Sequence, residues 1–281
     1  MEFDYIIIGA GSAGCVVANR ITSVDGNKVL LLEAGPKNTA LSLKIPAAIL
    51  SNLTSTKHNW AFQGEPEPEL NDRTLKHDRG KTLGGSSSIN GLVFIRGHAL
   101  DFDGWQQAGC TGWGFADVLP YFKKMETYKG GTDEYRGRDG PLHVHRSTPE
   151  DPLSIAFLQA GKEAGYPETN DISGYRQEGF GGFDRTVFKG ERWSTARAYL
   201  DPIRHRQNLK IQTNTQVQRL LFEGTRATGV IYKDKNGVSQ IVEAKKEIIL
   251  SAGAVGSPHL LMLSGVGPAH HLQKNGVDLV K

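Results

Sequence analysis

Residues 4–14 read Asp-Tyr-Ile-Ile-Ile-Gly-Ala-Gly-Ser-Ala-Gly, and this stretch decides the fold. The apolar, β-branched run at residues 4–8 is typical of a buried parallel strand. Apolar side chains at helical spacing follow over residues 12–23, and a second buried strand is expected at residues 28–33. Strand, helix and strand within about 30 residues predict a βαβ unit with a right-handed crossover.

The glycines between the first strand and the helix form the pattern G-x-G-x-x-G, with Gly9, Gly11 and Gly14 at its fixed positions. The first glycine permits a tight turn, the second lets a pyrophosphate approach the backbone, and the third lets the helix pack close to the strand. Glu33 ends the second strand, 19 residues after Gly14, where a carboxylate accepts hydrogen bonds from an adenosine ribose. The pattern predicts dinucleotide binding. The acid disfavours NADP, whereas FAD and NAD both stay open at this point.

The composition excludes several other classes of protein. The 33 basic and 30 acidic side chains give a formal charge of +3, which supplies no argument for a nucleic-acid partner. The two cysteines, Cys15 and Cys110, make neither a disulfide framework nor a zinc site. Glycine accounts for 34 of the 281 residues, against a usual share of roughly 7%. This excess indicates many tight turns, or backbone that lies close to a bulky group.

A second glycine cluster lies within residues 79–98, where Gly84 and Gly85 precede three serines and an apolar run from Leu92 to Ile95. Adjacent glycines and polar donors beside an apolar segment predict a backbone pressed against a flat ligand, and an isoalloxazine ring suits such a cradle. NAD alone would not require this cluster. A solvated Ser/Gly linker is the alternative, and the apolar run argues against it.

With both clusters in view, the sequence resembles the glucose–methanol–choline (GMC) family of flavin oxidoreductases. Residues 80–103 follow the first signature of that family and residues 253–267 follow the second, and the resemblance runs from Asp4 to near Lys281. Residues 79–105 are most similar to the branch that contains choline dehydrogenases. The resemblance implies an α/β fold with a Rossmann-like FAD-binding domain, in which a parallel sheet with flanking helices carries an antiparallel β excursion. Only part of the substrate domain is expected.

The resemblance also implies three segments along the chain. Residues 1–150 would form the FAD-binding core with the cofactor loop and lid, and residues 151–200 a partial substrate-domain segment. Residues 201–281 would return to the FAD-binding domain. The C-terminal half of the family fold is expected to lie beyond them.

The family's cofactor-binding roles carry over only where the residues match. The resemblance implies that the first glycine turn holds the FAD pyrophosphate, that the end of the second strand binds the adenosine ribose, and that the second cluster lines the cofactor and runs beneath the flavin. It further implies a backbone contact to the adenine and a closing contact on the adenosine side. The pyrophosphate residues are Gly9, Gly11, Ser12, Ala13 and Gly14, and the ribose residues are Glu33 and Ala34. The residues that line the cofactor and run beneath the flavin are Leu83, Gly84, Asn90, Gly91, Leu92 and Val93. Val217 would make the adenine contact, and Ala252 and Gly253 would make the closing contact.

The chemistry that the resemblance implies is oxidation of a small alcohol, choline-like or another primary alcohol, to the aldehyde by hydride transfer to flavin N5. Electrons would pass on to a quinone, a carrier or oxygen. The family's proton-accepting histidine lies near the C-terminus of a longer chain. We therefore assign no catalytic residue here and expect the 281-residue chain alone to be inactive. A lyase with structural FAD, and a non-catalytic remnant or split subunit, are the alternatives.

The attachment of the cofactor can also be predicted. Some members of the family bind FAD covalently through a histidine just before the asparagine of the first signature. Ile89 occupies that position and carries no nucleophile, so we expect non-covalent FAD. None of the nine histidines forms a metal-ligand pair at a useful spacing, and no metal is expected.

Pattern and spacing predict further elements along the chain. We expect Trp105, Trp113, Tyr121 and Phe122 in the core rather than in a cation cage, and an exposed loop at residues 129–140. Helices are expected at 115–127, 152–164 and 256–263, strands at 209–213, 216–223 and 227–233, and two more strands within 239–251.

The sequence shows no targeting signal. The N-terminus lacks a basic segment and a cleavage-site pattern, and no apolar run approaches the roughly 20 residues that a spanning helix needs. We expect a cytoplasmic protein without a transmembrane segment, and peripheral association with a membrane stays open.

Overall fold

The computed structural model describes residues 2–280, and the chain divides into two compact units. Unit 1 contains the residues up to Asn90 together with those from Ser194 onward, and unit 2 contains Gly91–Trp193. The chain therefore leaves unit 1 once and returns to it. The three functional segments expected from the sequence, at 1–150, 151–200 and 201–281, stay a prediction, because the units describe compactness and not function.

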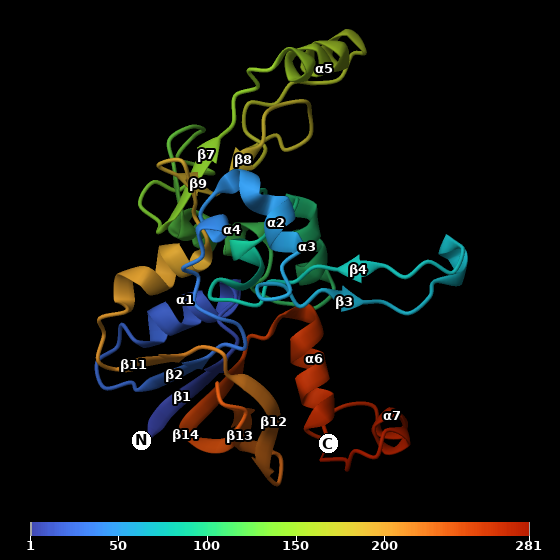
Figure 1. Cartoon of the computed structure of the whole chain (residues 1–281). Coiled ribbons are helices and arrows are strands. Elements are labelled where there is room, and N and C mark those ends of the chain that lie inside the picture. Colours follow the sequence, from blue (N-terminus) through green and yellow to red (C-terminus); the bar gives the residue numbers. More distant parts are fainter. Residues whose placement is uncertain (1, 281) are drawn as a thin grey trace. The chain divides into compact units, whose positions relative to one another are not determined.

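Unit 1 is built on a six-stranded sheet in the order β11-β2-β1-β14-β13-β12 (Figure 1). The first four of these strands run parallel, and β13 and β12 continue the sheet antiparallel. This mixture confirms the predicted α/β fold with its antiparallel excursion. The strands are β1 (Phe3–Ile8), β2 (Val29–Leu32), β11 (Leu209–Gln212), β12 (Gln216–Glu223), β13 (Arg226–Lys233) and β14 (Ser239–Leu250).

The prediction of two strands within residues 239–251 is wrong, because β14 is one continuous strand of 12 residues. Its first half pairs antiparallel with β13, and its second half pairs parallel with β1. Lys245 and Lys246, in the middle of the strand, lie at exposed positions, where they form ion pairs with Glu2 and Asp4. The strand thus joins the antiparallel and the parallel parts of the sheet.

The core of unit 1 lies where the apolar strands meet the helices. Ile6, Ile8, Leu30 and Leu32 are at most 4% exposed and cluster with Leu260. The helices are α1 (Ser12–Ile21), α2 (Ile49–Leu53), α6 (Gly253–Leu263) and α7 (Ala269–Lys274). Helix α6 begins three residues earlier than predicted, and it contacts β12. Short helical turns and the hairpin of β3 (Phe62–Gln63) and β4 (Lys76–His77) lie between residues 41 and 88.

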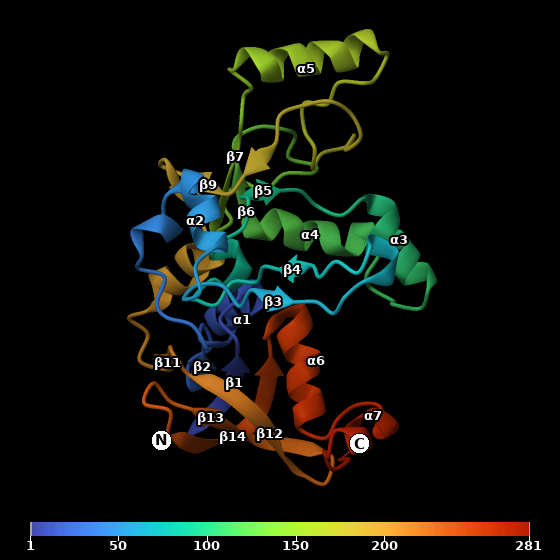
Figure 2. The same cartoon turned by 45° about the vertical axis from the view of Figure 1, so that its right-hand side comes forward.

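Unit 2 contains a four-stranded sheet in the order β5-β8-β7-β6. Its helices α3 and α4 lie side by side (Figure 2). The elements are β5 (Val93–Phe94), β6 (Glu126–Tyr128), β7 (Leu142–Arg146), β8 (Asp184–Arg185), the hairpin of β9 (Val187–Phe188) and β10 (Glu191–Arg192), α3 (Ala99–Gln107), α4 (Phe115–Met125) and α5 (Pro152–Glu163).

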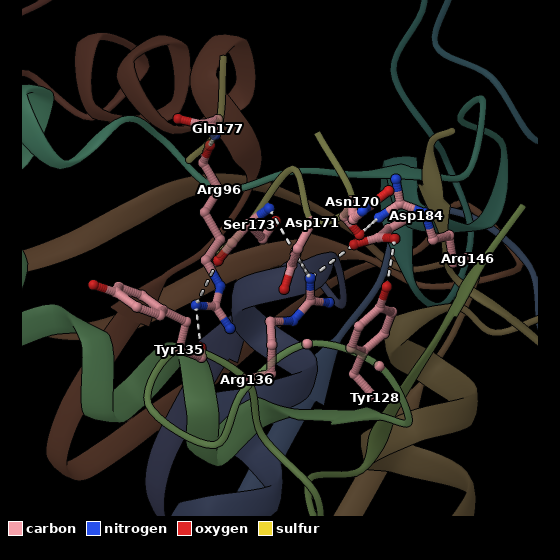
Figure 3. Close-up of polar contacts among 12 residues, drawn as sticks. Arg96, Tyr128, Tyr135, Arg136, Arg146, Asn170, Asp171, Ser173, Gln177 and Asp184 are labelled. Atoms are coloured by element: carbon pink, nitrogen blue, oxygen red, sulfur yellow. Dashed lines mark hydrogen bonds and ion pairs between the residues drawn. The ribbon is translucent and has the colours of Figure 1, made fainter. Parts of the chain in front are cut away.

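The loop at residues 129–140 is not wholly exposed, which corrects the expectation from its four glycines. Arg136 within it is fully buried in unit 2 and forms ion pairs with Asp171 and Asp184 at 2.6 and 2.8 Å (Figure 3). A third ion pair, at 2.9 Å, joins it to Glu126. Because one guanidinium meets three carboxylates, its charge is compensated inside the protein. This buried cluster holds the loop in place.

The aromatic residues of α3 and α4 also differ from expectation. Phe102 is buried, and it contacts the rings of Trp105, Phe115 and Phe122 at 5.3–6.3 Å between centroids. Trp105, Trp113 and Tyr121 are instead more than half exposed, so their expected core position is wrong. The helix pair buries one aromatic ring, half-buries Phe115 and Phe122 against it, and leaves the other three exposed. Among the described residues, no helix has the length and apolar character that crossing a bilayer requires.

Candidate cofactor site

The carboxyl ends of the central parallel strands meet at one edge of the unit 1 sheet. Gly9, Glu33 and Ser251 directly follow β1, β2 and β14. Backbone hydrogen bonds of 2.8 Å, from Gly9 N to Leu32 O and from Ser251 N to Ile8 O, fix the ends of the strands together. In open α/β sheets ligands bind outside this edge, so the position of the glycine turn indicates a ligand site.

The turn between β1 and α1 needs glycine at two positions. Gly9 has a φ of +92°, and a Cβ there would stand 2.5 Å from the carbonyl oxygen of Ser251. A Cβ on Gly14 would stand 2.0 Å from the carbonyl oxygen of Gly9. The turn is thus closed between α1 and the end of β14, as the fingerprint predicts.

The first turn of α1 keeps its amide donors available. Gly11 is the N-cap residue, and in the described chain no side chain caps the helix. Ser12 and Ala13 at the start of the helix are exposed. Uncapped N–H groups and the positive end of the helix dipole together make a site for phosphate oxygens. The residues present therefore fit a pyrophosphate.

Glu33 is a buried acid, only 6% exposed, held by two backbone amides. Its Oε2 accepts a hydrogen bond from Ala10 N and its Oε1 accepts one from Gly35 N, both at 2.8 Å. Burial raises the pKa of the Glu33 carboxyl to about 7, although both hydrogen bonds act in the opposite direction. Each oxygen has a second lone pair, so the carboxylate can still accept hydroxyl donors of a ribose.

The second glycine cluster packs directly against the first. Gly84 N donates to Ala10 O at 2.7 Å, and a Cβ on Gly85 would stand 2.7 Å from the Cα of Gly11. The close approach of two protein loops therefore requires glycine at 85, whereas Gly84 has a φ of +90° and a Cβ there would stand 2.3 Å from Ser88 Oγ. The expected contact of this cluster with a flat ligand stays a prediction. The cluster still contributes to the carboxyl edge of the sheet, which we call the cofactor edge, because it packs against the first glycine turn and holds it in place.

The structure brings most of the predicted site residues together in unit 1. The first glycine turn, Glu33 with Ala34, Leu83 with Gly84, and Ala252 with Gly253 all lie around the carboxyl edge of the sheet. Val217 lies near the start of β12, and its half-buried side chain packs against the core. It follows Thr215, whose N–H donates to Glu33 O at 2.9 Å.

The predicted flavin segment crosses the boundary between the units. Asn90 is the last residue of this part of unit 1, whereas Gly91, Leu92 and Val93 begin unit 2. Leu92 has a φ of +68°, and Val93 opens β5. The contribution of this segment to the site stays a prediction.

Several supporting residues were not found from the sequence. Ser251 supplies the carbonyl that closes against Gly9, and a Cβ on Gly35 would stand 1.9 Å from Lys81 O. Thr195 shares a hydrogen bond of 2.9 Å with the Ser87 hydroxyl. The glycine right after Glu33-Ala34 was a signal for a close approach, but nothing in the sequence indicated Lys81 as its neighbour.

Metal binding and thiol chemistry find no support at this edge. The described residues contain no cluster of three or more His, Cys, Asp or Glu side chains that could hold a metal ion. Cys15 is buried, and burial raises the pKa of its thiol to about 12. Its Sγ lies 3.2 Å from Ala10 O, to which it donates. A protonated thiol of this kind packs as a small apolar residue.

The sheet order, the glycine turn and the buried acid define an open α/β dinucleotide-binding domain. Comparison with known proteins then identifies the family. The family model described as GMC oxidoreductase matches residues 3–279. The chain belongs to the GMC oxidoreductase family, and its cofactor is FAD.

Individual relatives agree with this assignment. The mitochondrial choline dehydrogenase of Mus musculus is 50% identical over 99% of this chain and 48% of its own length. The oxygen-dependent choline dehydrogenase of Sinorhizobium fredii is 48% identical over 99% of this chain and 50% of its own. The crystal structure of pyridoxine 4-oxidase from Mesorbium loti has a TM-score of 0.94 at 34% identity, over 99% of this chain and 55% of that one. The chain spans about half the length of the curated relatives it matches.

The substitution Gly14→Ala should lower the stability of the protein and its flavin content. The added Cβ overlaps the backbone of Gly9, so we expect a loss of about 3 kcal/mol or more in the free energy of unfolding. The matched control is Gly104→Ala inside α3, where nothing lies within 4 Å; it should be neutral or stabilising by up to about 1 kcal/mol. Urea unfolding and the flavin absorbance of the purified variants test both. Equal stability and flavin content in the two variants would contradict the proposed closure.

Glu33 should make the stability of the FAD-free protein depend on pH. Its folded pKa of about 7 lies above the ordinary value of 4.5, so the folded chain binds more protons than the unfolded chain between these values. This contribution is complete below pH 4.5 and is lost as the pH rises through 7, by about 3 kcal/mol in all.

We expect Glu33→Gln to remove this loss, while the exposed-site control Glu69→Gln keeps it. The measurement is urea unfolding of the FAD-free chain from pH 5 to 8 at constant ionic strength. Parallel curves for the wild type and Glu33→Gln would show that the buried acid does not titrate as described.

Proposed function

We propose that the protein oxidises a primary alcohol to the aldehyde with FAD, and that this chain supplies the FAD-binding part. The observation that carries the proposal is the carboxyl edge of unit 1, where a closed glycine turn, uncapped helix amides and a buried acid converge. Membership of the GMC oxidoreductase family supports the same reaction class.

The proposed substrate is choline or a related small alcohol. The basis is similarity, since two relatives near 50% identity are named choline dehydrogenases and a structural relative is named pyridoxine 4-oxidase. All three names are consistent with a hydroxymethyl or hydroxyethyl group as the site of oxidation. A quinone, a carrier or oxygen is the proposed electron acceptor.

Within the proposal each part of the edge has a binding role. The α1 amides hold the pyrophosphate, Glu33 accepts hydrogen bonds from the adenosine ribose, and the second glycine cluster fixes the turn. Val217 offers its backbone to the adenine, Ala252 and Gly253 close over the adenosine side, and the segment from Asn90 to Val93 runs beneath the flavin. When bound, FAD supplies a hydride acceptor, which no amino-acid side chain provides.

The proton of the alcohol needs a base that we do not assign within this chain. None of its nine histidines is proposed for that role. In the proposal the base belongs to the part of the family length that this chain does not cover. The 281 residues alone would then bind FAD without oxidising alcohol.

FAD should dissociate from the protein on denaturation. Ile89 is 2% exposed and has no nucleophilic atom with which to attach the cofactor. We expect all flavin in the supernatant after acid precipitation of the FAD-loaded protein, and no fluorescent protein band on a denaturing gel. A fluorescent band at the mass of the chain would falsify non-covalent binding.

Choline should reduce the flavin in the complete gene product but not in the 281-residue chain. The readout is anaerobic loss of the visible flavin absorbance after mixing. Tetramethylammonium, which matches the cation and lacks the hydroxyl, controls for binding without chemistry. Flavin reduction in the short chain would mean that a base lies within it. A complete protein whose flavin no primary alcohol reduces would reject the oxidase function and favour a lyase with structural FAD.

A further inference from the structure

A small cavity of about 210 Å³ lies within unit 2 and contains none of the residues assigned to FAD. It is bounded by the start of α3, the start of α4 and the segment 173–177. The side chains that matter are the basic group of Arg96, the hydroxyl of Ser173, and the rings of Phe115, Tyr135 and Tyr175. The cavity thus combines polar hydrogen atoms with aromatic walls.

Two buried donors in this wall have no hydrogen-bond partner within residues 2–280. Arg96 is 5% exposed, and its Nη1 donates to Tyr135 O at 2.6 Å (Figure 3). Its Nη2 donates to Glu126 Oε1, also at 2.6 Å. Its Nε and the hydroxyl of Ser173, which is 4% exposed, find no hydrogen-bond partner among the described residues. Buried donors without an acceptor destabilise a fold, so two such donors in one cavity wall indicate an acceptor that binds there.

The charge of Arg96 distinguishes it from the neighbouring guanidinium. Arg136 is paired with three carboxylates, and although burial acts against its charge, these partners raise its pKa. Arg96 is paired with Glu126 alone, which it shares with Arg136, and burial lowers its pKa. Its positive charge is therefore less well compensated. The described residues that line the cavity include no Asp or Glu.

We propose that this cavity binds a small carboxylate, whose oxygens accept hydrogen bonds from Arg96 Nε and Ser173 Oγ. A carboxylate supplies both acceptors and the missing negative charge, whereas a water molecule would supply acceptors only. The Ser173 hydroxyl hydrogen rotates to meet an acceptor. The Tyr175 ring contacts that of Tyr135 and is 88% exposed, so little burial is lost if it moves when a ligand binds.

Calorimetric titration of the FAD-loaded protein with sodium acetate, at constant ionic strength, tests this proposal. Acetamide, which has nearly the same shape without the charge, is the control ligand. We expect saturable binding of acetate at least 10-fold tighter than that of acetamide. Equal affinities would overturn the carboxylate assignment, and the absence of saturable heat would mean that the donors bind water only.

Two variants separate the site from a general effect. Ser173→Ala removes one donor without adding bulk, and Ala99→Leu fills the cavity while both donors remain. Both should weaken acetate binding at least 10-fold with unchanged FAD content, which keeps this test independent of the proposed function. Ser239→Ala, at an exposed position in unit 1, is the matched control and should bind acetate as the wild type does. Wild-type affinity in Ser173→Ala and Ala99→Leu would overturn the proposal.

Discussion

The close contact between the β1–α1 turn and the end of β14 is the constraint on which the rest of unit 1 depends. The carbonyl oxygen of Ser251 stands where a side chain on Gly9 would begin, and the carbonyl of Gly9 in turn meets Gly14. Two further backbone approaches extend this contact outward, from Gly11 to Gly85 and from Gly80 to Gly85 O. Much of the glycine excess of this region therefore comes from protein loops that touch one another. The cofactor edge is the outer surface of that packed backbone.

Glu33 shows what this packing does to charge. The same turn that brings Ala10 N to the carboxylate also removes water from it, and burial outweighs the two hydrogen bonds in setting its pKa. A bound ribose would add donors to the charged form and lower that pKa again. In the proposed role, FAD thus stabilises the charged form of Glu33, which burial disfavours when no cofactor is bound. Cofactor binding and the stability of the fold are linked through one side chain.

Sequence reasoning succeeded where the pattern was local and failed where partners were distant. The βαβ unit and the turn at Gly9–Gly14 depend on spacing within about 30 residues, and these predictions are confirmed. The break expected within residues 239–251 was wrong, because β14 changes partner from β13 to β1 and its pattern reflects two environments. Arg136 was predicted in an exposed loop because its ion-pair partners Asp171 and Asp184 lie far from it in the sequence, and no local pattern indicates them. The contact of Gly85 with Gly11 was not predicted for the same reason, because the two residues lie more than 70 positions apart in the sequence.

The path of the chain explains why the family signature straddles two compact units. The chain leaves unit 1 after Asn90 and re-enters it at Ser194. Just inside these two points, Ser87 and Thr195 are joined by hydrogen bonds of 2.9 and 3.0 Å, and Thr195 Oγ1 also donates to Gly84 O at 3.4 Å. The exit and the return are therefore held together within unit 1, at the loop that closes the glycine turn. Because the segment from Asn90 to Val93, which we propose to run beneath the flavin, begins three residues after Ser87, the point from which it leaves unit 1 is fixed by unit 1 itself.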